Sequence, residues 1–200
     1  DYRLHLTALE GVNLYEPEEL VLRAGAATSL GQIQAMLAQQ RQQLAFEPPD
    51  FSDLYGNLTD QTIGGVLSAN LAGPRRIKAG AARDHFLGLE AVSGRGAAFK
   101  SGGRVVKNVT GYDLCKLMAG SFGTLAALTE VTVKVLPVPE KTRTVLLFGQ
   151  DDPAAITAMS QAAGSPHEVS ALAHLPSAIA ARSAVSYIKD AGAAVTAVRV

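Results

Sequence analysis

The sequence predicts an α+β fold, and three observations support this. Residues 126–136 alternate apolar and polar side chains, which is typical of a half-buried strand. In contrast, Leu30, Ile33 and Leu37 recur at the spacing of an amphipathic helix. Alanine, the strongest helix former, occurs fifteen times in residues 151–200, which favours helices there.

Composition excludes several classes of protein. The 200 residues contain 18 Lys and Arg against 18 Asp and Glu, so bulk charge does not favour binding to nucleic acid or an anionic membrane. An apolar fraction of 48% is enough for a packed core. One cysteine excludes an internal disulfide framework and fits a reducing compartment such as the cytoplasm. No apolar run reaches the ~20 residues of a membrane-spanning helix.

The N-terminal third reads as two strands and a helix. Residues 3–9 alternate like a half-buried strand, and residues 19–24 form a second candidate strand. Ser29 stands three residues before Gln32, a capping-box spacing that predicts a helix running to about Gln42.

The middle of the chain predicts a short helix over residues 62–70 and a hairpin between residues 87–92 and 97–100. Thr110 is expected to cap a helix over residues 111–119. The residues expected on the inward side of that helix are Leu114, Leu117 and Met118.

The change in composition predicts a domain boundary that separates residues 1–140 from residues 141–200. The second part reads strand, helix, strand, helix, strand, with strands at 144–148, 168–174 and 194–200 and the first helix at 153–163. Both chain ends are strand-like, which is typical of a fragment, and the strand ending at Val200 is expected to lack sheet neighbours.

Glycine clusters point to places where the backbone closely approaches a ligand or another segment. Neither a P-loop nor a Gly-x-Gly-x-x-Gly fingerprint is present, but clusters occur at residues 62–65, 101–104 and 120–124. A helix start at Gly64-Gly65 is expected to expose unpaired N–H groups to a phosphate or a heterocycle. The alternative is a tight turn with close helix–sheet packing.

Five ordered blocks of the sequence resemble the FAD-binding domain of the vanillyl-alcohol-oxidase (PCMH-type) family. Residues 107–114 are similar to the glycolate-oxidase-like branch, and residues 72–76 resemble the smaller of the two flavin subunits in that branch. The five blocks are Thr62-Ile63-Gly64-Gly65, residues 79–84, residues 87–90, residues 103–114 and residues 120–125.

The resemblance implies a two-part FAD site. Residues 1–140 are then an FAD-binding domain without its N-terminal subdomain, and residues 141–200 are part of a ferredoxin-like cap. Without the Gly-rich loop of that subdomain, the chain alone is expected to bind FAD poorly. The residues that the resemblance assigns to the cofactor are Gly64, Gly65, Ser68, Ala69, Arg83, Gly120, Gly123, Thr124 and Leu128. For Arg83, the alternative is an ion pair with Asp84 that fixes the loop.

No catalytic or metal-binding residue is evident. The histidines His5, His85, His167 and His174 are scattered without ligand spacing and are expected at the surface or half-buried. His85 is the exception, because it follows Arg83-Asp84 near the inferred flavin. Cys115 and Tyr112 are interpreted as packing residues. The basic cluster Arg75, Arg76 and Lys78 is either a solvated loop or a contact for a phosphate or an acidic partner.

The resemblance implies the FAD-binding subunit of a multi-subunit glycolate oxidase, relaying electrons from 2-hydroxy-acid oxidation. Its implied partners are a larger flavin subunit and an iron–sulfur subunit, and its implied location is the cytoplasm, with peripheral membrane association through the complex. Two alternatives are an independent FAD-dependent 2-hydroxy-acid dehydrogenase and a flavin-free assembly subunit.

Overall fold

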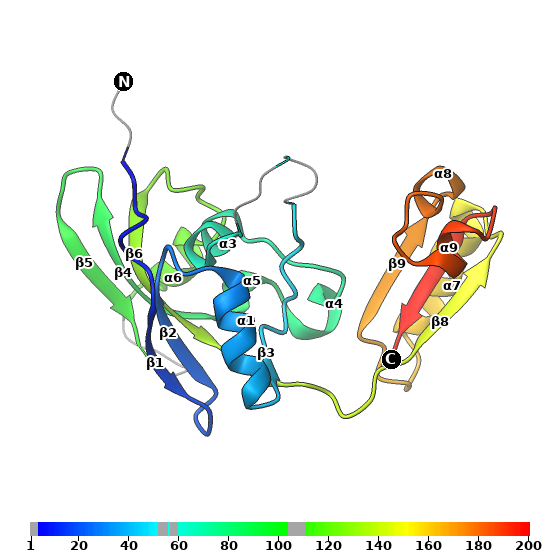
Figure 1. Ribbon diagram of the computed structural model, residues 1–200, viewed down its shortest axis with the longest axis horizontal. Coiled ribbons are helices and arrows are strands. Elements are labelled where there is room, and N and C mark those ends of the chain that lie inside the picture. The colour runs from blue at the N-terminus through cyan, green and yellow to red at the C-terminus, as the bar shows by residue number, and fades with distance from the viewer. Residues whose placement is uncertain (1–3, 52–55, 57–59, 104–110) are drawn as a thin grey trace. The chain divides into compact units, whose positions relative to one another are not determined.

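The computed structural model shows two compact units, each with an antiparallel sheet and helices, which confirms the α+β fold (Figure 1). The structure describes all residues except 1–3, 52–55, 57–59 and 104–110. Unit 1 comprises Asp1–Gly73 and Gly80–Val138, and unit 2 comprises Pro74–Ala79 and Pro139–Val200.

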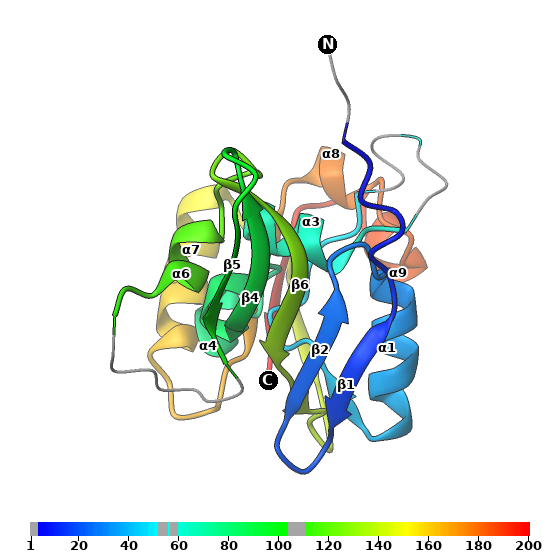
Figure 2. The same ribbon diagram turned by 90° about the vertical axis from the view of Figure 1, so that its left-hand side faces the viewer.

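Unit 1 is built on a five-stranded antiparallel sheet with the order β1-β2-β6-β4-β5, which can be followed in Figure 2. The hairpin predicted in the middle of the chain is confirmed as β4 and β5. The alternation predicted after residue 126 is also confirmed, because Val131 and Val133 are fully buried on one face of β6. The strands are β1 Val12–Glu16, β2 Val21–Gly25, β4 Phe86–Ser93, β5 Ala98–Gly102 and β6 Ala126–Lys134.

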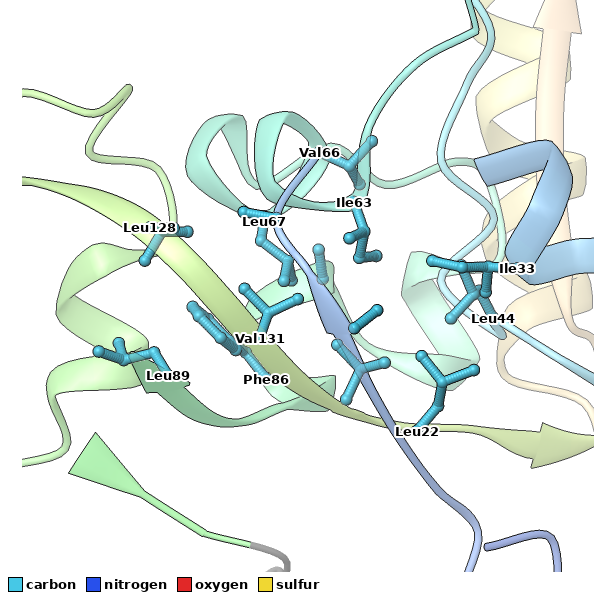
Figure 3. Packing of buried hydrophobic residues seen from close by; sticks show 14 of the residues in the cluster. Leu22, Ile33, Leu44, Ile63, Val66, Leu67, Phe86, Leu89, Leu128 and Val131 are labelled. Atoms are coloured by element: carbon cyan, nitrogen blue, oxygen red, sulfur yellow. The ribbon is translucent and has the colours of Figure 1, made fainter. Parts of the chain in front are cut away.

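Helices and a short strand pair complete unit 1. The predicted cap of the first helix is confirmed, since the Ser29 hydroxyl accepts the Gln32 N–H at 3.1 Å. Figure 3 shows Ile63 and Leu67 reaching from α3 toward Val131 in the core. The helices are α1 Leu30–Gln39, α3 Ile63–Ala69, α5 Ala82–His85 and α6 Leu114–Met118, and the paired strands are β3 Gln42–Gln43 and β7 Leu136–Pro137.

The strand predicted over residues 3–9 is wrong, because residues 4–9 form a turn and irregular chain. The Leu9 N–H donates to the Leu6 carbonyl at 2.9 Å, and the Leu9 carbonyl accepts the Ala27 N–H at 2.9 Å. A Cβ on Gly25 would lie 2.3 Å from that carbonyl oxygen. The segment therefore crosses over the end of β2, where tertiary hydrogen bonds override its alternating pattern.

The helix predicted over residues 111–119 is shorter, since α6 begins after Asp113, whose carboxylate accepts the Lys116 N–H at 3.1 Å. The predicted cap, Thr110, lies outside the described residues. Cys115 and Met118 are buried, whereas Leu117 faces solvent. The buried side of this helix therefore differs from the one predicted, which included Leu117.

Unit 2 contains a three-stranded antiparallel sheet with the order β8-β10-β9. Because β10 runs antiparallel to both neighbours, β8 and β9 are parallel and α7 makes the crossover between them, as in a split β-α-β arrangement. The elements are α4 Arg76–Ala79, β8 Thr144–Phe148, α7 Asp152–Ala163, β9 Ala171–Leu175, α8 Ser177–Ala180, α9 Ser186–Lys189 and β10 Val195–Arg199.

Two expectations for this unit are corrected. The strand ending next to Val200 is the central strand of its sheet, so the open edges belong to β8 and β9. The basic cluster is only in part a loop, since Arg75 lies in a turn whereas Arg76 and Lys78 belong to α4, which lies beside β9. The Lys78 ammonium donates to Glu168. This contact holds the pKa of Glu168 below its usual range. Across the described part of the chain, the helices are too short or too polar to cross a bilayer.

Candidate functional site

The N-terminal turn of α3 has its backbone donors already paired. The Ile63 N–H donates to the Thr28 carbonyl at 2.9 Å, and the Gly64 N–H donates to the Ala26 carbonyl at 2.9 Å. The Gly65 N–H donates to the hydroxyl of Thr62, the N-cap residue, at 3.2 Å. The expectation of unpaired N–H groups at this helix start is therefore wrong, and its use for a phosphate loses its physical basis.

The two adjacent glycines of α3 face different surroundings. A Cβ on Gly64 would lie 2.7 Å from both the carbonyl oxygen and the Cβ of Ala26, so this buried position requires glycine for close packing. Gly65 is exposed, and a Cβ there would meet only the Thr62 hydroxyl at 3.2 Å. The packing interpretation is correct for Gly64, whereas Gly65 leaves an open backbone surface.

A glycine-rich loop is fixed to the C-terminal end of α3. The helix ends at Asn70, which has the left-handed conformation. The Gly120 N–H donates to the Leu67 carbonyl at 3.3 Å, and the Phe122 N–H donates to the Ser68 carbonyl at 2.9 Å. Carbonyls at the end of the helix therefore position the loop, with the Leu67 carbonyl also accepting the Asn70 N–H at 3.0 Å. Gly123 supplies a left-handed residue with φ of +73°.

Helix α3 and this loop bound a cavity of about 440 Å³, within the range of small-molecule sites. Most of its walls are small or apolar, and none of the described residues lining it is charged. The hydroxyl of Ser68 has no hydrogen-bond partner among the described residues. The lining residues are Leu4, Leu6, Thr7, Ala26, Ala27, Thr62, Gly64, Gly65, Ser68, Gly123, Ala126, Ala127 and Leu128.

The structure brings together five of the nine residues that the sequence assigned to the cofactor. These five are Gly64, Gly65, Ser68, Gly123 and Leu128. The other four, Ala69, Arg83, Gly120 and Thr124, do not line the cavity. Thr124 stabilises the loop, because its hydroxyl donates to the Ser121 carbonyl at 2.6 Å.

Sequence reasoning missed the alanine walls of the cavity. Ala26 and Ala27 follow β2, and Ala126 and Ala127 begin β6. The sequence contained a signal for both pairs, because each consists of two small residues directly after Gly25 or soon after Gly123. Leu4, Leu6 and Thr7 carried no such signal, because they were assigned to a strand that does not form.

Arg83 and Asp84 do not form an ion pair within the described chain. The Asp84 carboxylate instead accepts the Ala81 N–H at 2.8 Å and caps α5. The side chain of Arg83 is exposed, and its backbone N–H donates to the Asn70 side chain at 2.9 Å. Hydrogen bonds to Asp84 and Asn70 therefore hold this loop, not the alternative ion pair.

His85 is fully buried in the core, away from the cavity lining, which corrects both expectations for it. Its ring lies 5.2 Å from that of Phe46, and its Nδ1 lies 3.3 Å from the Lys134 carbonyl oxygen. Tyr112 is exposed and does not pack as expected. Cys115 is a core residue, and burial raises the pKa of its thiol to about 11. Among the described residues, no cluster suited to a metal ion occurs.

Comparisons with known proteins give a matching family and several similar proteins. The family described as "FAD binding domain" matches residues 2–102. Glycolate oxidase subunit GlcE of Escherichia coli (strain K12) is 43% identical over 139 residues, which are 70% of this chain and 37% of that protein. Glycolate oxidase subunit GlcD of Bacillus subtilis (strain 168) is 43% identical over 113 residues, which are 56% of this chain and 23% of that protein.

A dehydrogenase and a solved structure are also similar. D-lactate dehydrogenase of Archaeoglobus fulgidus is 34% identical over 122 residues, covering 61% of this chain and 26% of that protein. A structure of alkyldihydroxyacetonephosphate synthase superimposes with a TM-score of 0.71 at 17% identity, covering 96% of this chain and 36% of the other. That structure supports the fold alone. This chain spans less than two fifths of the length of each of these proteins.

Proposed function

Because this chain belongs to the family of FAD binding domains, whose cofactor is FAD, we propose that the cavity beside α3 holds the flavin end of that cofactor. One observation carries the proposal. Two glycine-bearing segments far apart in sequence, α3 and the loop with Gly123, wall one cavity with small, uncharged residues. Such walls fit a flat, largely apolar heterocycle.

The lining favours the flavin ring over the pyrophosphate. A diphosphate requires cationic side chains or free backbone donors, and here the lining is uncharged and the first-turn N–H groups of α3 are paired. The open backbone at Gly65 and the left-handed Gly123 provide flat contact surfaces, while the Ser68 hydroxyl provides a polar group for the edge of the ring or the ribityl chain. Leu128 and Gly64 contribute apolar wall.

The other assigned residues are proposed to stabilise the helix and the loop that form the walls of the site. Gly120 and Thr124 keep the loop against α3, and Ala69 belongs to the helix turn that this loop caps. Arg83 contributes through its backbone N–H, which anchors Asn70 at the end of α3. When bound, the flavin supplies the redox chemistry, and these residues supply its orientation and exclude water from its surroundings.

At the level of the whole protein, the proposed role is the FAD-binding subunit of a multi-subunit glycolate oxidase that relays electrons from 2-hydroxy-acid oxidation. The 43% identity to GlcE and GlcD supports it, as does the uncharged lining, which offers no general base for substrate oxidation. The proposed partners are a larger flavin subunit and an iron–sulfur subunit. The single buried cysteine fits a cytoplasmic location.

Reconstitution tests the subunit role. A protein that contains this chain is purified alone and with both partner subunits, and glycolate-dependent dye reduction is measured. Turnover is expected only in the complex. The second candidate function, an independent 2-hydroxy-acid dehydrogenase, is favoured by the 34% identity to D-lactate dehydrogenase. It replaces the subunit role if the protein alone oxidises glycolate or lactate at the rate of the complex.

The flavin site is tested by nuclear magnetic resonance, because this method detects weak binding. The ¹⁵N-labelled chain is titrated with flavin mononucleotide (FMN), which carries the flavin ring, or with ADP, which carries the adenosine and the pyrophosphate of FAD without the flavin ring. FMN is expected to shift the amide signals of Gly65, Ser68 and Gly123, and ADP is expected to leave them unchanged. The proposal fails if ADP shifts the same signals or if FMN shifts none of them.

A further inference from the structure

Thr28 is a fully buried threonine whose hydroxyl bonds to a segment far from it in sequence. The hydroxyl oxygen accepts the Gly11 N–H at 3.0 Å. It also lies 2.7 Å from the Gly25 carbonyl oxygen and 3.1 Å from the Gly11 carbonyl oxygen. A hydroxyl has a single proton to donate, and the shorter distance favours the Gly25 carbonyl. The side chain of Thr28 therefore joins the chain before β1 to the end of β2.

The backbone of Thr28 connects a third segment. Its carbonyl accepts the N–H of Ile63, the first residue of α3, at 2.9 Å. Its own N–H donates to the Gly25 carbonyl at 3.0 Å. One buried residue thus holds together residues 4–11, the end of β2 and the start of α3.

Residues 4–11 form part of the wall of the cavity beside α3. Leu4, Leu6 and Thr7 line it, although residues 4–11 form neither a helix nor a strand. Besides the bonds to the Thr28 hydroxyl, this segment is joined to the end of β2 by two backbone hydrogen bonds. The Ala27 N–H donates to the Leu9 carbonyl, and the Gly25 N–H donates to the Gly11 carbonyl, both at 2.9 Å. With so few bonds, the position of this wall depends strongly on each of them.

We propose that Thr28 is a positioning residue of the cavity, whose buried hydroxyl holds residues 4–11 in place as a wall beside α3. Thr28 does not line the cavity, so it acts through Gly11. Among the described residues, the Gly11 N–H has no acceptor other than this hydroxyl. Removal of the hydroxyl leaves that donor unpaired, which is costly in a partly buried place. The proposal rests on the proposed flavin site, because it assigns an apolar wall of that site to Leu4 and Leu6.

A purely local role for the hydroxyl is less consistent with the structure. Threonine side chains often close a turn by bonding to a carbonyl three residues earlier, as Thr28 does with Gly25. That turn, however, is already closed by the backbone N–H of Thr28, which donates to the same carbonyl. What the hydroxyl adds is the bond to Gly11, which no backbone group of Thr28 makes.

The test uses three variants of the 200-residue chain. Thr28→Val keeps the size of the side chain and removes the hydroxyl, whereas Thr28→Ser keeps the hydroxyl and removes the methyl group. Thr132→Val is the matched control, because Thr132 is also buried in unit 1, lies outside the cavity lining and has no hydroxyl partner among the described residues. Circular dichroism checks that each variant is folded.

The first readout is amide hydrogen exchange at Leu9 and Ala27, measured by nuclear magnetic resonance. The reference is the Val135 N–H, which donates to the Leu20 carbonyl at the other end of β2 and reports on opening of the whole unit. Relative to this reference, Leu9 and Ala27 are expected to exchange at least about tenfold faster in the Val variant of Thr28. The Ser variant and the control variant are expected to stay within about threefold of wild type.

The second readout is FMN affinity, which is expected to fall at least about fivefold in Thr28→Val and to stay within about twofold of wild type in Thr28→Ser. Equal FMN affinity in the wild type and Thr28→Val would overturn the positioning role. So would equal exchange in these two proteins, or a Ser variant that exchanges as fast as the Val variant.

Fast exchange of Leu9 and Ala27 in the wild type would also overturn the proposal, and this result requires no variant to fold. A wild-type chain that does not bind FMN would instead contradict the proposed flavin site. The exchange measurements do not depend on FMN, so they still decide whether Thr28 holds residues 4–11.

Discussion

The two faces of helix α3 have different surroundings, one buried and one open. Its inner face, with Ile63, Gly64 and Leu67, is buried against the core and Ala26. Its outer face, with Gly65 and Ser68, is open to the cavity. Of the two adjacent glycines, Gly64 is therefore required for close packing, whereas Gly65 leaves an open surface. Gly64 also lines the cavity, but only Gly65 has room for a side chain, so the proposed flavin site predicts that a change at Gly65 alters cofactor binding with little effect on stability.

The largest predicted effect is on the inner face. Gly64→Ala places a Cβ 2.7 Å from the backbone and side chain of Ala26, and neither can move without shifting the segment after β2. We expect the free energy of unfolding to fall by about 3 kcal/mol in urea denaturation, despite the gain of about 1 kcal/mol in helix propensity.

Gly65→Ala is the matched control, because it makes the same change one residue along the same helix. Its Cβ meets only the Thr62 hydroxyl at 3.2 Å, so the free energy of unfolding should change by less than about 1 kcal/mol. Equal losses in both variants would contradict the distinction between the two faces.

Cys115 extends the comparison to a titrating group of the core. Burial raises the pKa of its thiol from 9.0 to about 11, so the folded protein retains a proton that the unfolded chain has already released. Stability from this group is complete below about pH 9 and decreases between pH 9 and 11, by about 1–2 kcal/mol.

The measurement is the difference in unfolding free energy between wild type and Cys115→Ala from pH 8 to 10.5. Taking the difference cancels the contribution of other titrating groups to the pH dependence. One such group is Tyr15, because burial also raises the pKa of its hydroxyl. A difference that stays constant with pH would show that the thiol is not protected by the core.

Gly123, in the loop that borders the cavity, provides a further comparison with Gly64. Its φ of +73° is unfavourable for any residue with a Cβ, although a Cβ there would meet no atom within 4 Å. Gly123→Ala should therefore cost about 1 kcal/mol of stability through backbone strain alone. Calorimetry checks this, and a loss as large as that of Gly64→Ala would indicate an unrecognised packing role.

The smallest effect on stability is predicted for Ser68→Ala. Its hydroxyl lacks a hydrogen-bond partner among the described residues, so removing it should change the unfolding free energy by less than about 0.5 kcal/mol. FMN binding is expected to weaken about three- to tenfold, because the polar group facing the ligand is lost. Unchanged affinity in a fluorescence titration would remove Ser68 from the site.

Local signals in the sequence predicted much of the fold. The Ser29–Gln32 spacing predicted a helix cap, and the alternation around Val131 and Val133 predicted a buried strand, because both patterns arise within a few residues. The segment before Leu9 also alternates, but its hydrogen bond to Ala27 and the close approach to Gly25 come from outside it. Periodicity alone contains no information about such contacts.

The candidate site was predictable in part for the same reason. Glycine-rich blocks marked Gly65 and Gly123, which line one cavity. The pairing of the Ile63 N–H with Thr28, however, depends on how the chain folds back on α3 and was not visible in the sequence. His85 was placed near the flavin because it follows Arg83 in sequence, yet it is the last residue of α5 and is buried in the core.

The central claim is that the outer face of α3 binds the flavin, and the affinity of Gly65→Val for FMN tests it most directly. Gly94→Val is the control, since Gly94 lies outside the cavity lining and a Cβ there meets no atom within 4 Å. We predict that Gly65→Val binds FMN at least about tenfold more weakly than wild type while its unfolding free energy stays within about 1 kcal/mol, and that Gly94→Val binds like wild type. Equal FMN affinity in all three proteins would contradict the account.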